Sequence, residues 1–263
     1  MLYDRYELLK FERRGKILTV TMDNPPVNAA SFQLHDELSH IFYDIARDPD
    51  CHVVILTGAG RAFSAGGDFH GMLKSIEDTK VRAESMRRAP HIVHSLLGLD
   101  KPVIARVNGH AMGLGATLAL LCDVVIAADT AKIADSHVNV GLSAGDGGSL
   151  LWPQLIGFAR ARHHLLTGEP IGAVEAAAIG LIYKAVPADM LDAEVDAYAE
   201  KLASGATEAI RATKQSINMV LRRQAEAAIE AHIGLENLTM SSDHHKDAVL
   251  ALMEKRAPVF KAD

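Results

Sequence analysis

The segment Lys101–Asp129, KPVIARVNGHAMGLGATLALLCDVVIAAD, carries two strand patterns separated by a glycine-rich turn and a helix pattern. The apolar runs at 101–109 and 123–129, rich in β-branched residues, are typical of buried strands. Between them, Gly113 and Gly115 interrupt the sequence at the point where a helical stretch begins. This order of strand, glycine turn, helix and strand predicts an α/β fold.

The same order recurs on both sides of this segment. Residues 52–58, HVVILTG, fit a strand buried on both faces, and a glycine-rich loop, GAGRAFSAGGDF, follows at 58–69. A polar helical stretch then occupies about residues 76–97. Downstream, residues 131–135, AKIAD, add one more strand. The recurrence favours a fold built from repeated strand–turn–helix units.

The two ends of the chain differ in character. Residues 6–23 predict two short strands around a tight turn, and Ser31 is a suitable N-cap for an amphipathic helix. From about residue 192 onward the sequence contains no strand candidate and is almost entirely helix-forming. We therefore expect an α/β core over 1–191 and a helical region over 192–263 that covers the core or packs against another subunit.

Composition and charge exclude several classes of protein. The 263-residue chain has 49% hydrophobic and 23% charged residues, which argues against disorder, and its net charge of −6 gives no reason to expect nucleic acid as a partner. The amino terminus lacks the apolar segment of a secretory signal, and the longest central apolar run is too short to cross a bilayer. Cys51 and Cys122 lie in apolar runs, which predicts buried free thiols. We expect a cytoplasmic protein without a membrane partner.

The glycine-rich loop at 58–69 does not match a nucleotide-binding motif. Gly58 and Gly60 fit the start of G-x-G-x-x-G, but Phe63 occupies the position of the third glycine. No G-x-x-x-x-G-K-[ST] motif occurs in the sequence. Neither a dinucleotide-binding function nor a P-loop function is therefore expected.

Four separate segments resemble the crotonase family, that is, the enoyl-CoA hydratase/isomerase superfamily. They are GRAFSAGGDF (60–69), the segment 101–129, VGLSAGDGG (140–148) and LTGEPIGAVEAAAIGLIYKAV (166–186). The resemblance implies a spiral of repeated ββα units with an all-helical carboxy-terminal region that builds homotrimers or dimers of trimers. It also implies an acyl-CoA thioester as the usual ligand, with coenzyme A as part of the substrate and no other cofactor.

Two glycine turns correspond to the oxyanion hole of this family. A thioester enolate is a developing oxyanion, and two convergent backbone N–H groups stabilise such a charge by about 3–4 kcal/mol each. Ala65, just before Gly66-Gly67, matches the first donor, and Leu114 matches the second. Leu114 also opens an apolar helix, whose N-terminal dipole favours negative charge. The plainer alternative is that these glycines only permit tight turns.

The acid/base residues depart from those of the family's hydratases. Those enzymes place two glutamates over the substrate, and the corresponding positions here are Thr117 and His137. A threonine hydroxyl has no useful basicity near neutral pH, whereas a histidine can carry a proton. Asp146, nine residues after His137, is expected to orient the imidazole or to act as a second acid. The family's isomerases usually carry this carboxylate at the position of Gly145. Alternatively, His137 is a structural loop residue and Asp146 a turn residue.

Glu236, in the helical tail, is a third acid of interest. A smaller branch of the superfamily hydrolyses the C–C bond of β-diketones with a His, an Asp nine residues later and a Glu from the tail. His137, Asp146 and Glu236 stand at such spacings. That branch usually has a further histidine where this chain has Leu114, and His110, on the other side of the turn, does not replace it. The plainer alternative for Glu236 is a solvated helix residue.

Five other residues are expected to contact the substrate or its CoA moiety. Three of them lie at the first glycine turn and two in the closing segment RAPVFKAD, which resembles the part of the family that covers the nucleotide: Ala62, Phe63, Asp68, Phe260 and Lys261. Asp68 could instead cap the next helix. No metal site is expected, because the histidine pairs at 163–164 and 244–245 lack a ligand set at suitable spacing.

Together these features predict an enzyme of the hydratase/isomerase class that acts on an acyl-CoA thioester, with His137 and Asp146 in place of the glutamate pair. Two alternatives stay open. The first is a hydrolase that cleaves a C–C bond of β-diketone or β-ketoacyl substrates with His137, Asp146 and Glu236. The second is a non-catalytic protein that binds CoA esters.

Overall fold

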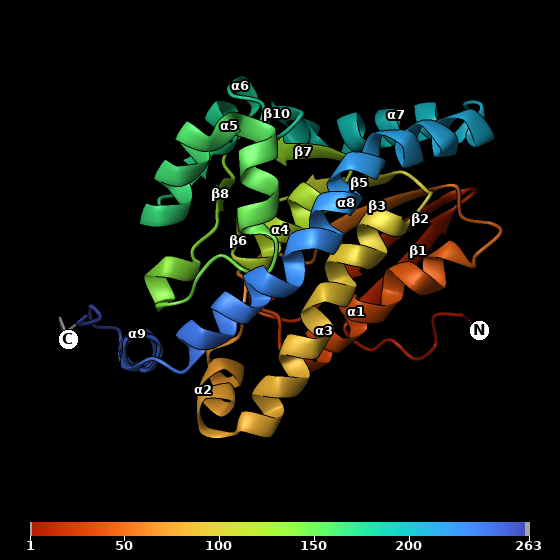
Figure 1. Cartoon of the computed structure of the whole chain (residues 1–263). Coiled ribbons are helices and arrows are strands. Elements are labelled where there is room, and N and C mark those ends of the chain that lie inside the picture. The colour runs from red at the N-terminus through yellow and green to blue at the C-terminus, as the bar shows by residue number, and fades with distance from the viewer. Residues whose placement is uncertain (1, 261–263) are drawn as a thin grey trace.

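Two β-sheets of unequal size form the centre of the molecule, which a computed structural model describes over residues 2–260 (Figure 1). The larger sheet has six strands in the order β1-β2-β3-β5-β7-β10: β1 (Leu9–Arg14), β2 (Ile17–Met22), β3 (Val53–Gly58), β5 (Val103–Val107), β7 (Val124–Ala128) and β10 (Lys184–Val186). The smaller sheet has four in the order β4-β6-β8-β9: β4 (Ala62–Ser64), β6 (His110–Met112), β8 (Lys132–Ala134) and β9 (Ile171–Gly172). β1 and β2 are antiparallel, and the larger sheet is parallel from β2 to β10.

Successive strands alternate between the two sheets, and this alternation produces a repeated unit. β3, β5 and β7 enter the larger sheet, whereas the strands that follow them, β4, β6 and β8, enter the smaller one. A helix follows each pair of strands: α2 (Phe69–Glu77), α4 (Leu114–Leu121) and α5 (Gly148–Thr167), the last after a short 3₁₀ helix, η1 (His137–Val140). The expected spiral of ββα units is confirmed.

The central strand β3 of the larger sheet is buried on both faces, as the apolar run at 52–58 predicts. Along β3, Val54 and Leu56 belong to the core shared with α1 (Phe32–Ala46) and α3 (Thr79–Gly98). The intervening Val53 and Ile55 belong to a second core, formed with α7 (Leu191–Ala203) on the opposite face. Because successive strand residues point to opposite faces, a strand covered on both sides must be apolar throughout.

The amino-terminal helix and the region after β4 show how caps set helix boundaries. α1 begins after Ser31, whose hydroxyl accepts a hydrogen bond from the N–H of Leu34 at 3.3 Å, as expected. The single helical stretch expected at about 76–97 is instead the end of α2 followed by α3. Asp78 has extended backbone angles and caps α3 through its side chain, which ends one helix and starts the next.

The carboxy-terminal region contains helices only, as far as residue 260. After α6 (Ala173–Ala178) and the 3₁₀ helix η2 (Ala188–Met190) come α7, α8 (Thr207–Met240) and α9 (Asp243–Met253). The long α8 runs beside α3 and α5, and α9 packs against α2 and η1 (Figure 1). The expected helical region is confirmed, whereas its separation as a domain from residue 192 and its role in assembly stay predictions.

Two smaller expectations concern the cysteines and the apolar stretches. Cys51 and Cys122 are buried and free, as the sequence predicts, and burial raises the pKa of the Cys51 thiol to about 11. Within residues 2–260, no helix combines the length and the apolar character needed to cross a membrane.

Candidate active site

Three loops that follow neighbouring strands of the smaller sheet meet at one edge of it. β4 and β8 both pair in parallel with β6, so that the carboxyl ends of the three strands lie side by side, about 4.8 Å from strand to strand. The loops carry Ala65 to Gly67 after β4, Gly113 and Leu114 after β6, and Asp135 to His137 after β8. Strand pairing thus brings together positions that are far apart in the sequence.

The available backbone N–H groups at this edge are those of Gly67 and Leu114. Within the described chain neither has a hydrogen-bond partner. Gly67 lies opposite Ala30 in a β-bridge whose hydrogen bonds are made by Gly66 and Asp68. Leu114 is the first residue of α4, after the N-cap Gly113. The N–H of Ala65 instead donates to the carbonyl oxygen of Val27 at 3.0 Å. The expectation that Ala65 is the first oxyanion donor is therefore corrected: its N–H is already engaged, and Gly67 offers the available donor.

A cavity of about 100 Å³ lies beside these N–H groups. Its wall includes Gly67 and Leu114 together with the three acid/base residues expected from the sequence, His137, Asp146 and Glu236. A second cavity, of about 220 Å³, shares Gly67 and His137 with the first. The two cavities are therefore neighbours. The other apolar residues that line the first are Ala30, Phe32, Met72, Met86, Ala89, Leu142 and Met240.

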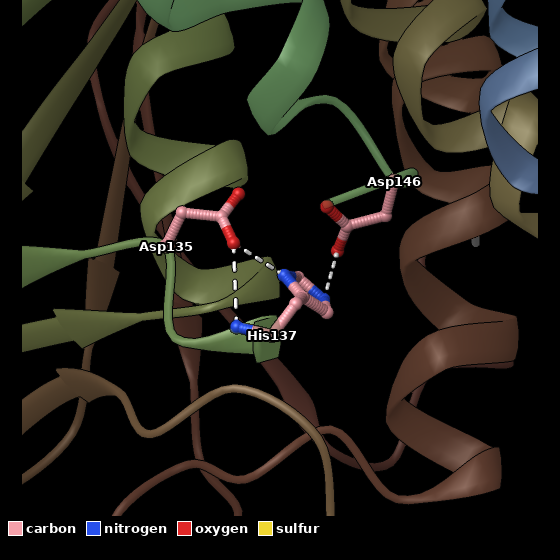
Figure 2. Close-up of side chains that lie close together, drawn as sticks. All are labelled: Asp135, His137 and Asp146. Carbon is pink, nitrogen blue, oxygen red and sulfur yellow. Dashed lines mark hydrogen bonds and ion pairs between the residues drawn. The ribbon is translucent and has the colours of Figure 1, made fainter. Parts of the chain in front are cut away.

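His137 lies between two aspartates (Figure 2). Its Nδ1 is 2.6 Å from Oδ1 of Asp135, and its Nε2 is 3.4 Å from Oδ2 of Asp146. The other carboxylate oxygen of Asp146 accepts a hydrogen bond from the hydroxyl of Thr117 at 3.0 Å. All four side chains are buried. The structure thus brings His137 and Asp146 together and adds Asp135, which the sequence analysis did not name as a site residue.

The two aspartates favour the charged form of the imidazole. Burial alone would lower the pKa of His137, but the charges of Asp146 and Asp135 outweigh burial and raise this pKa well above its ordinary value of 6.5. Burial alone would raise the pKa of Asp146, but the positive charge of His137 outweighs it and lowers this pKa. The His137–Asp146 pair therefore takes up a proton readily and can return it to a ligand.

Glu236 reaches the same cavity from α8. Its Oε2 is buried and has no hydrogen-bond partner among residues 2–260. Burial raises the pKa of Glu236 to about 8; the charge of His137 opposes this shift, and those of Asp146 and Asp135 add to it. At pH 7 this carboxyl group is mainly neutral and can donate a proton. Glu236 is therefore a buried residue that lines the cavity, and not a solvated helix residue.

Gly145 allows α8 to approach the loop that carries Asp146. A Cβ at Gly145 would lie 2.5 Å from the carbonyl oxygen of His232 and 2.7 Å from Oε2 of Glu236. Both distances are too short for real contacts, so that any side chain at this position would collide with α8. The carboxyl group of Glu236 lies in the space next to the position at which the family's isomerases carry their own carboxylate.

His35 is a second site residue that the sequence analysis did not name. It lies on α1 and lines the cavity of about 100 Å³. Burial lowers its pKa to about 4, even though the charge of Asp146 acts in the opposite direction, so that His35 is neutral at pH 7. Its signal in the sequence is weak, because it directly follows the core residue Leu34 in an ordinary amphipathic pattern.

Three residues near the first glycine turn were expected to contact the substrate. Asp68 lines the cavity and also caps α2, since its carboxylate accepts a hydrogen bond from the N–H of Gly71 at 2.8 Å. Phe63 is fully buried in the core, and Ala62 lies in β4 outside the walls of both cavities. The expected contacts of Phe63 and Ala62 with the ligand stay predictions.

The closing segment was expected to cover the nucleotide. Phe260 lies outside the walls of both cavities, and its ring contacts that of His244, with 5.4 Å between the ring centroids. Lys261 lies outside the described residues. The role of this segment in CoA binding stays a prediction.

The groups around His137 are arranged for proton transfer. Asp135, His137 and Asp146 are close enough to be considered as metal ligands. However, the two aspartates face opposite nitrogens of the ring, so that the imidazole itself stands between their oxygens (Figure 2). Hydrogen bonds along one line through a histidine orient the ring and set its charge.

Comparisons with known proteins point to one family. Residues 12–263 match the family Enoyl-CoA hydratase/isomerase. A probable enoyl-CoA hydratase of Mycobacterium bovis is 32% identical over 97% of this chain and 98% of that protein. A crystal structure of an enoyl-CoA hydratase/isomerase from Mycobacterium paratuberculosis has a TM-score of 0.91 at 34% identity, over 94% of this chain and 99% of that one.

A solved hydrolase is also similar. The β-diketone hydrolase of the cyanobacterium Anabaena, bound to (S)-3-oxocyclohexyl acetic acid, has a TM-score of 0.85 at 31% identity. The match covers 91% of this chain and 96% of that one. With the family match over nearly the whole length, these likenesses establish that the protein is an enzyme that belongs to the enoyl-CoA hydratase/isomerase family.

Proposed function

We propose that this enzyme binds an acyl-CoA thioester and catalyses water addition or proton transfer at the α and β carbons of the acyl group. The observation that carries the proposal is a convergence on one cavity. The backbone N–H groups of Gly67 and Leu114, which have no partner in the described part of the chain, lie there. Three proton-carrying groups, from His137, Asp146 and Glu236, line the same cavity. Enolate chemistry requires both kinds of group within reach of one ligand.

The thioester oxygen is the atom that the backbone N–H groups would stabilise. As the enolate forms, negative charge collects on this oxygen, and each N–H donor contributes about 3–4 kcal/mol to its stabilisation. The N–H of Leu114 belongs to the first turn of α4, so that the positive end of the helix dipole adds to the effect. The proposed donors are thus Gly67 and Leu114.

The proton steps follow from the charges of the side chains. In the hydration direction, the His137–Asp146 pair in its deprotonated form takes a proton from water while the water oxygen bonds to the β carbon. Glu236 then gives its proton to the α carbon of the enolate, and a proton passes from the pair to Glu236 to restore the starting state. For isomerisation, the same pair removes a proton from one carbon and returns it to another.

This assignment predicts a bell-shaped dependence of kcat/KM on pH. Activity rises with pH as the His137–Asp146 pair, whose imidazole has a raised pKa, loses its proton. Activity falls above about pH 8, where Glu236 ionises. Initial rates between pH 5 and about 10 measure both limbs, and a profile without an alkaline limb would remove Glu236 from the role of acid.

Turnover of trans-2-enoyl-CoA and 3-enoyl-CoA esters of short and medium length tests the proposal. We expect product with the wild type and a loss of at least about 10³-fold in kcat/KM for His137→Ala. His163→Ala is the matched control, because His163 is exposed and pairs with Glu169 away from both cavities. Failure of the wild type to convert any ester would contradict the proposal.

A C–C bond hydrolase is the second candidate, favoured by Glu236. The three residues of the hydrolase pattern, His137, Asp146 and Glu236, line one cavity in this structure. Moreover, neither of the two cavities has a lysine or arginine in its described walls that could pair with CoA phosphates. The similar hydrolase from Anabaena is named for action on β-diketones.

Hydrolysis would use the same groups in a different order. The deprotonated pair takes a proton from water as the water oxygen bonds to a ketone carbon. The C–C bond then breaks, the second ketone leaves as an enolate on the backbone N–H groups, and Glu236 protonates its carbon. Cleavage of a CoA-free β-diketone to a keto acid, together with no turnover of enoyl-CoA esters, would replace the first proposal with this one.

We also propose that the chain assembles into homotrimers or dimers of trimers. Large apolar side chains are exposed along α5 and α8, namely Phe158, Leu166, Ile217, Met219 and Val220. Large exposed apolar side chains on neighbouring helices are typical of an interface between subunits. Light scattering behind a sizing column checks the mass, and a monomer at micromolar concentration would contradict the proposal.

A further inference from the structure

Asp135 contacts His137 more closely than any other side chain in the site. Its Oδ1 lies 2.6 Å from Nδ1 of His137 and also accepts the backbone N–H of the same residue at 3.4 Å. Two contacts from one oxygen to one residue fix both the loop and the ring (Figure 2). Asp135 is only 2% exposed, directly after the last residue of β8.

Asp135 has no access to a ligand. It lines neither of the two cavities at the site, whereas His137 lines both, and Asp146 lines the smaller one together with Glu236. A group that touches His137 but not the cavity can act on the reaction only through His137. The two aspartates therefore differ in position although both contact the same ring.

The other carboxylate oxygen of Asp135, Oδ2, lies against the first residue of α5. A Cβ at Gly148, the first residue of α5, would overlap with Oδ2 of Asp135, so that the carboxylate packs directly against the helix N-terminus. The positive end of the α5 dipole thus faces this carboxylate group. Oδ2 has no hydrogen-bond partner within residues 2–260, which leaves Oδ1 and His137 as the directed contact of this side chain.

We propose that Asp135 is a positioning residue that holds the Nδ1–H of His137 and turns Nε2 toward Asp146 and the cavity. Asp146 is the partner that exchanges the proton with the ligand. This inference deepens the proposed function and rests on the proton-transfer role assigned there to His137. The two aspartates thus have different roles: Asp135 orients the imidazole, and Asp146 takes part in proton transfer.

Other charged or titratable groups also face this pair. Asp146 approaches from the loop before α5, Glu236 from α8 and His35 from α1. His245 on α9 binds the carbonyl oxygen of Val140 through Nδ1 at 2.6 Å, and its pKa is lowered, chiefly by burial and also by the charge of His137. Asp135 is distinguished from these groups by its contact with Nδ1 and by its separation from the cavities.

The variant Asp135→Asn tests the proposal, because it keeps the shape of the side chain and removes its charge. Titration of the ¹⁵N-labelled histidines by NMR follows Nδ1 and Nε2 of His137 without any turnover. We expect the midpoint of His137 to fall by about one pH unit or more in the variant. With an active substrate, kcat should fall by about 10²-fold with KM nearly unchanged, and the acidic limb of the pH profile should move to lower pH.

Asp48→Asn is the matched control. Asp48 is also a buried aspartate, 5% exposed, but it pairs with Arg13 far from the cavities. We expect this variant to lose stability without any change in the His137 titration or the acidic limb. An unchanged His137 midpoint in a folded Asp135→Asn variant would overturn the proposal.

Two further outcomes separate this proposal from the proposed function. If Asp135→Asn does not fold, the wild type still gives a test, because a His137 that carries its proton only on Nε2 would overturn the role of Asp135. If no substrate is turned over, the proposed function fails. The NMR titration still tests the role of Asp135, because it does not depend on turnover.

Discussion

Two buried aspartates in different regions show how differently this chain uses a carboxylate. Near the amino terminus, Asp48 accepts a hydrogen bond from the hydroxyl of Tyr3 at 2.6 Å and pairs with the permanently charged Arg13. In the site, Asp146 instead faces His137, whose charge depends on pH, and it shares this cation with Asp135. The first arrangement fixes a charge, whereas the second holds a proton that can move.

The comparison extends to atoms that lack partners. Both oxygens of Asp48 have hydrogen-bond donors in the described chain, from Arg13 and Tyr3 on one and the N–H of Asp50 on the other. In the site, Oδ2 of Asp135 and Oε2 of Glu236 are buried and have no hydrogen-bond partner among residues 2–260. At Glu236, which lines the cavity, such an atom is available to a ligand at a cost in stability.

Of the carboxyl-group variants Asp146→Asn, Asp48→Asn and Glu236→Gln, the first should have the largest effect. It should disrupt the site and leave unchanged the amino-terminal cluster of Tyr3, Arg13 and Asp48. The amide cannot exchange a proton with His137, and we expect kcat/KM to fall by about 10²–10³-fold. Steady-state kinetics on the active substrate measure the loss, and circular dichroism verifies the fold. Retention of more than about a tenth of the activity would assign Asp146 to a turn and not to the chemistry.

Asp48→Asn should break the amino-terminal cluster alone. The variant leaves Arg13 without a buried charged partner, which should cost about 2–3 kcal/mol of unfolding free energy near pH 7 with no change in kcat. Hydrogen bonds from Tyr3 and Arg13 outweigh burial and lower the pKa of Asp48 in the folded state. The charge thus stabilises the fold above the unfolded pKa of about 3.9, and the difference should vanish as pH falls below this value.

Urea unfolding of the wild type and the Asp48→Asn variant at neutral and acidic pH measures this linkage. A difference in stability that is as large at about pH 3 as at pH 7 would show that the charge of Asp48 is not responsible. A lower kcat in this variant would show that the two regions are coupled.

Glu236→Gln should raise the free energy of unfolding, whereas Asp48→Asn should lower it. The folded pKa of Glu236 is about 8, above its ordinary value of 4.5, so that the wild type loses stability as pH rises from about 4.5 to 8. The neutral glutamine avoids this loss, and we expect the variant to be more stable by about 1–3 kcal/mol at pH 7 while turning over more slowly. Thermal unfolding across pH checks the trend; equal stability at all pH values would contradict the raised pKa.

Much of the fold was predictable because local patterns and tertiary packing agree. The apolar run of β3 reflects burial on both faces, and Ser31 caps α1 in the way its position predicts. The break between α2 and α3 was missed, because Asp78 lies within an otherwise continuous helical pattern and acts only through its backbone angles and cap.

The site was predictable only in part. The spacing of His137, Asp146 and Glu236 indicated a set that the structure does bring together. The choice between Ala65 and Gly67 as a backbone donor depends on a hydrogen bond to Val27, a residue from a distant loop that no local pattern reveals. Asp135 and His35 were missed for a similar reason, since a residue after a strand and a polar residue in a helix are both common outside active sites.

Exchange of the α-hydrogens of a saturated acyl-CoA ester with deuterium from D₂O tests the central claim most directly. The exchange needs only enolate formation and proton transfer, and it is followed by NMR whether the natural reaction is hydration or isomerisation. The account predicts exchange by the wild type and a rate at least about 10²-fold lower for His137→Ala. Exchange by His137→Ala at the wild-type rate would contradict the assignment of His137 as the proton carrier, and no exchange by the wild type would contradict an acyl-CoA substrate.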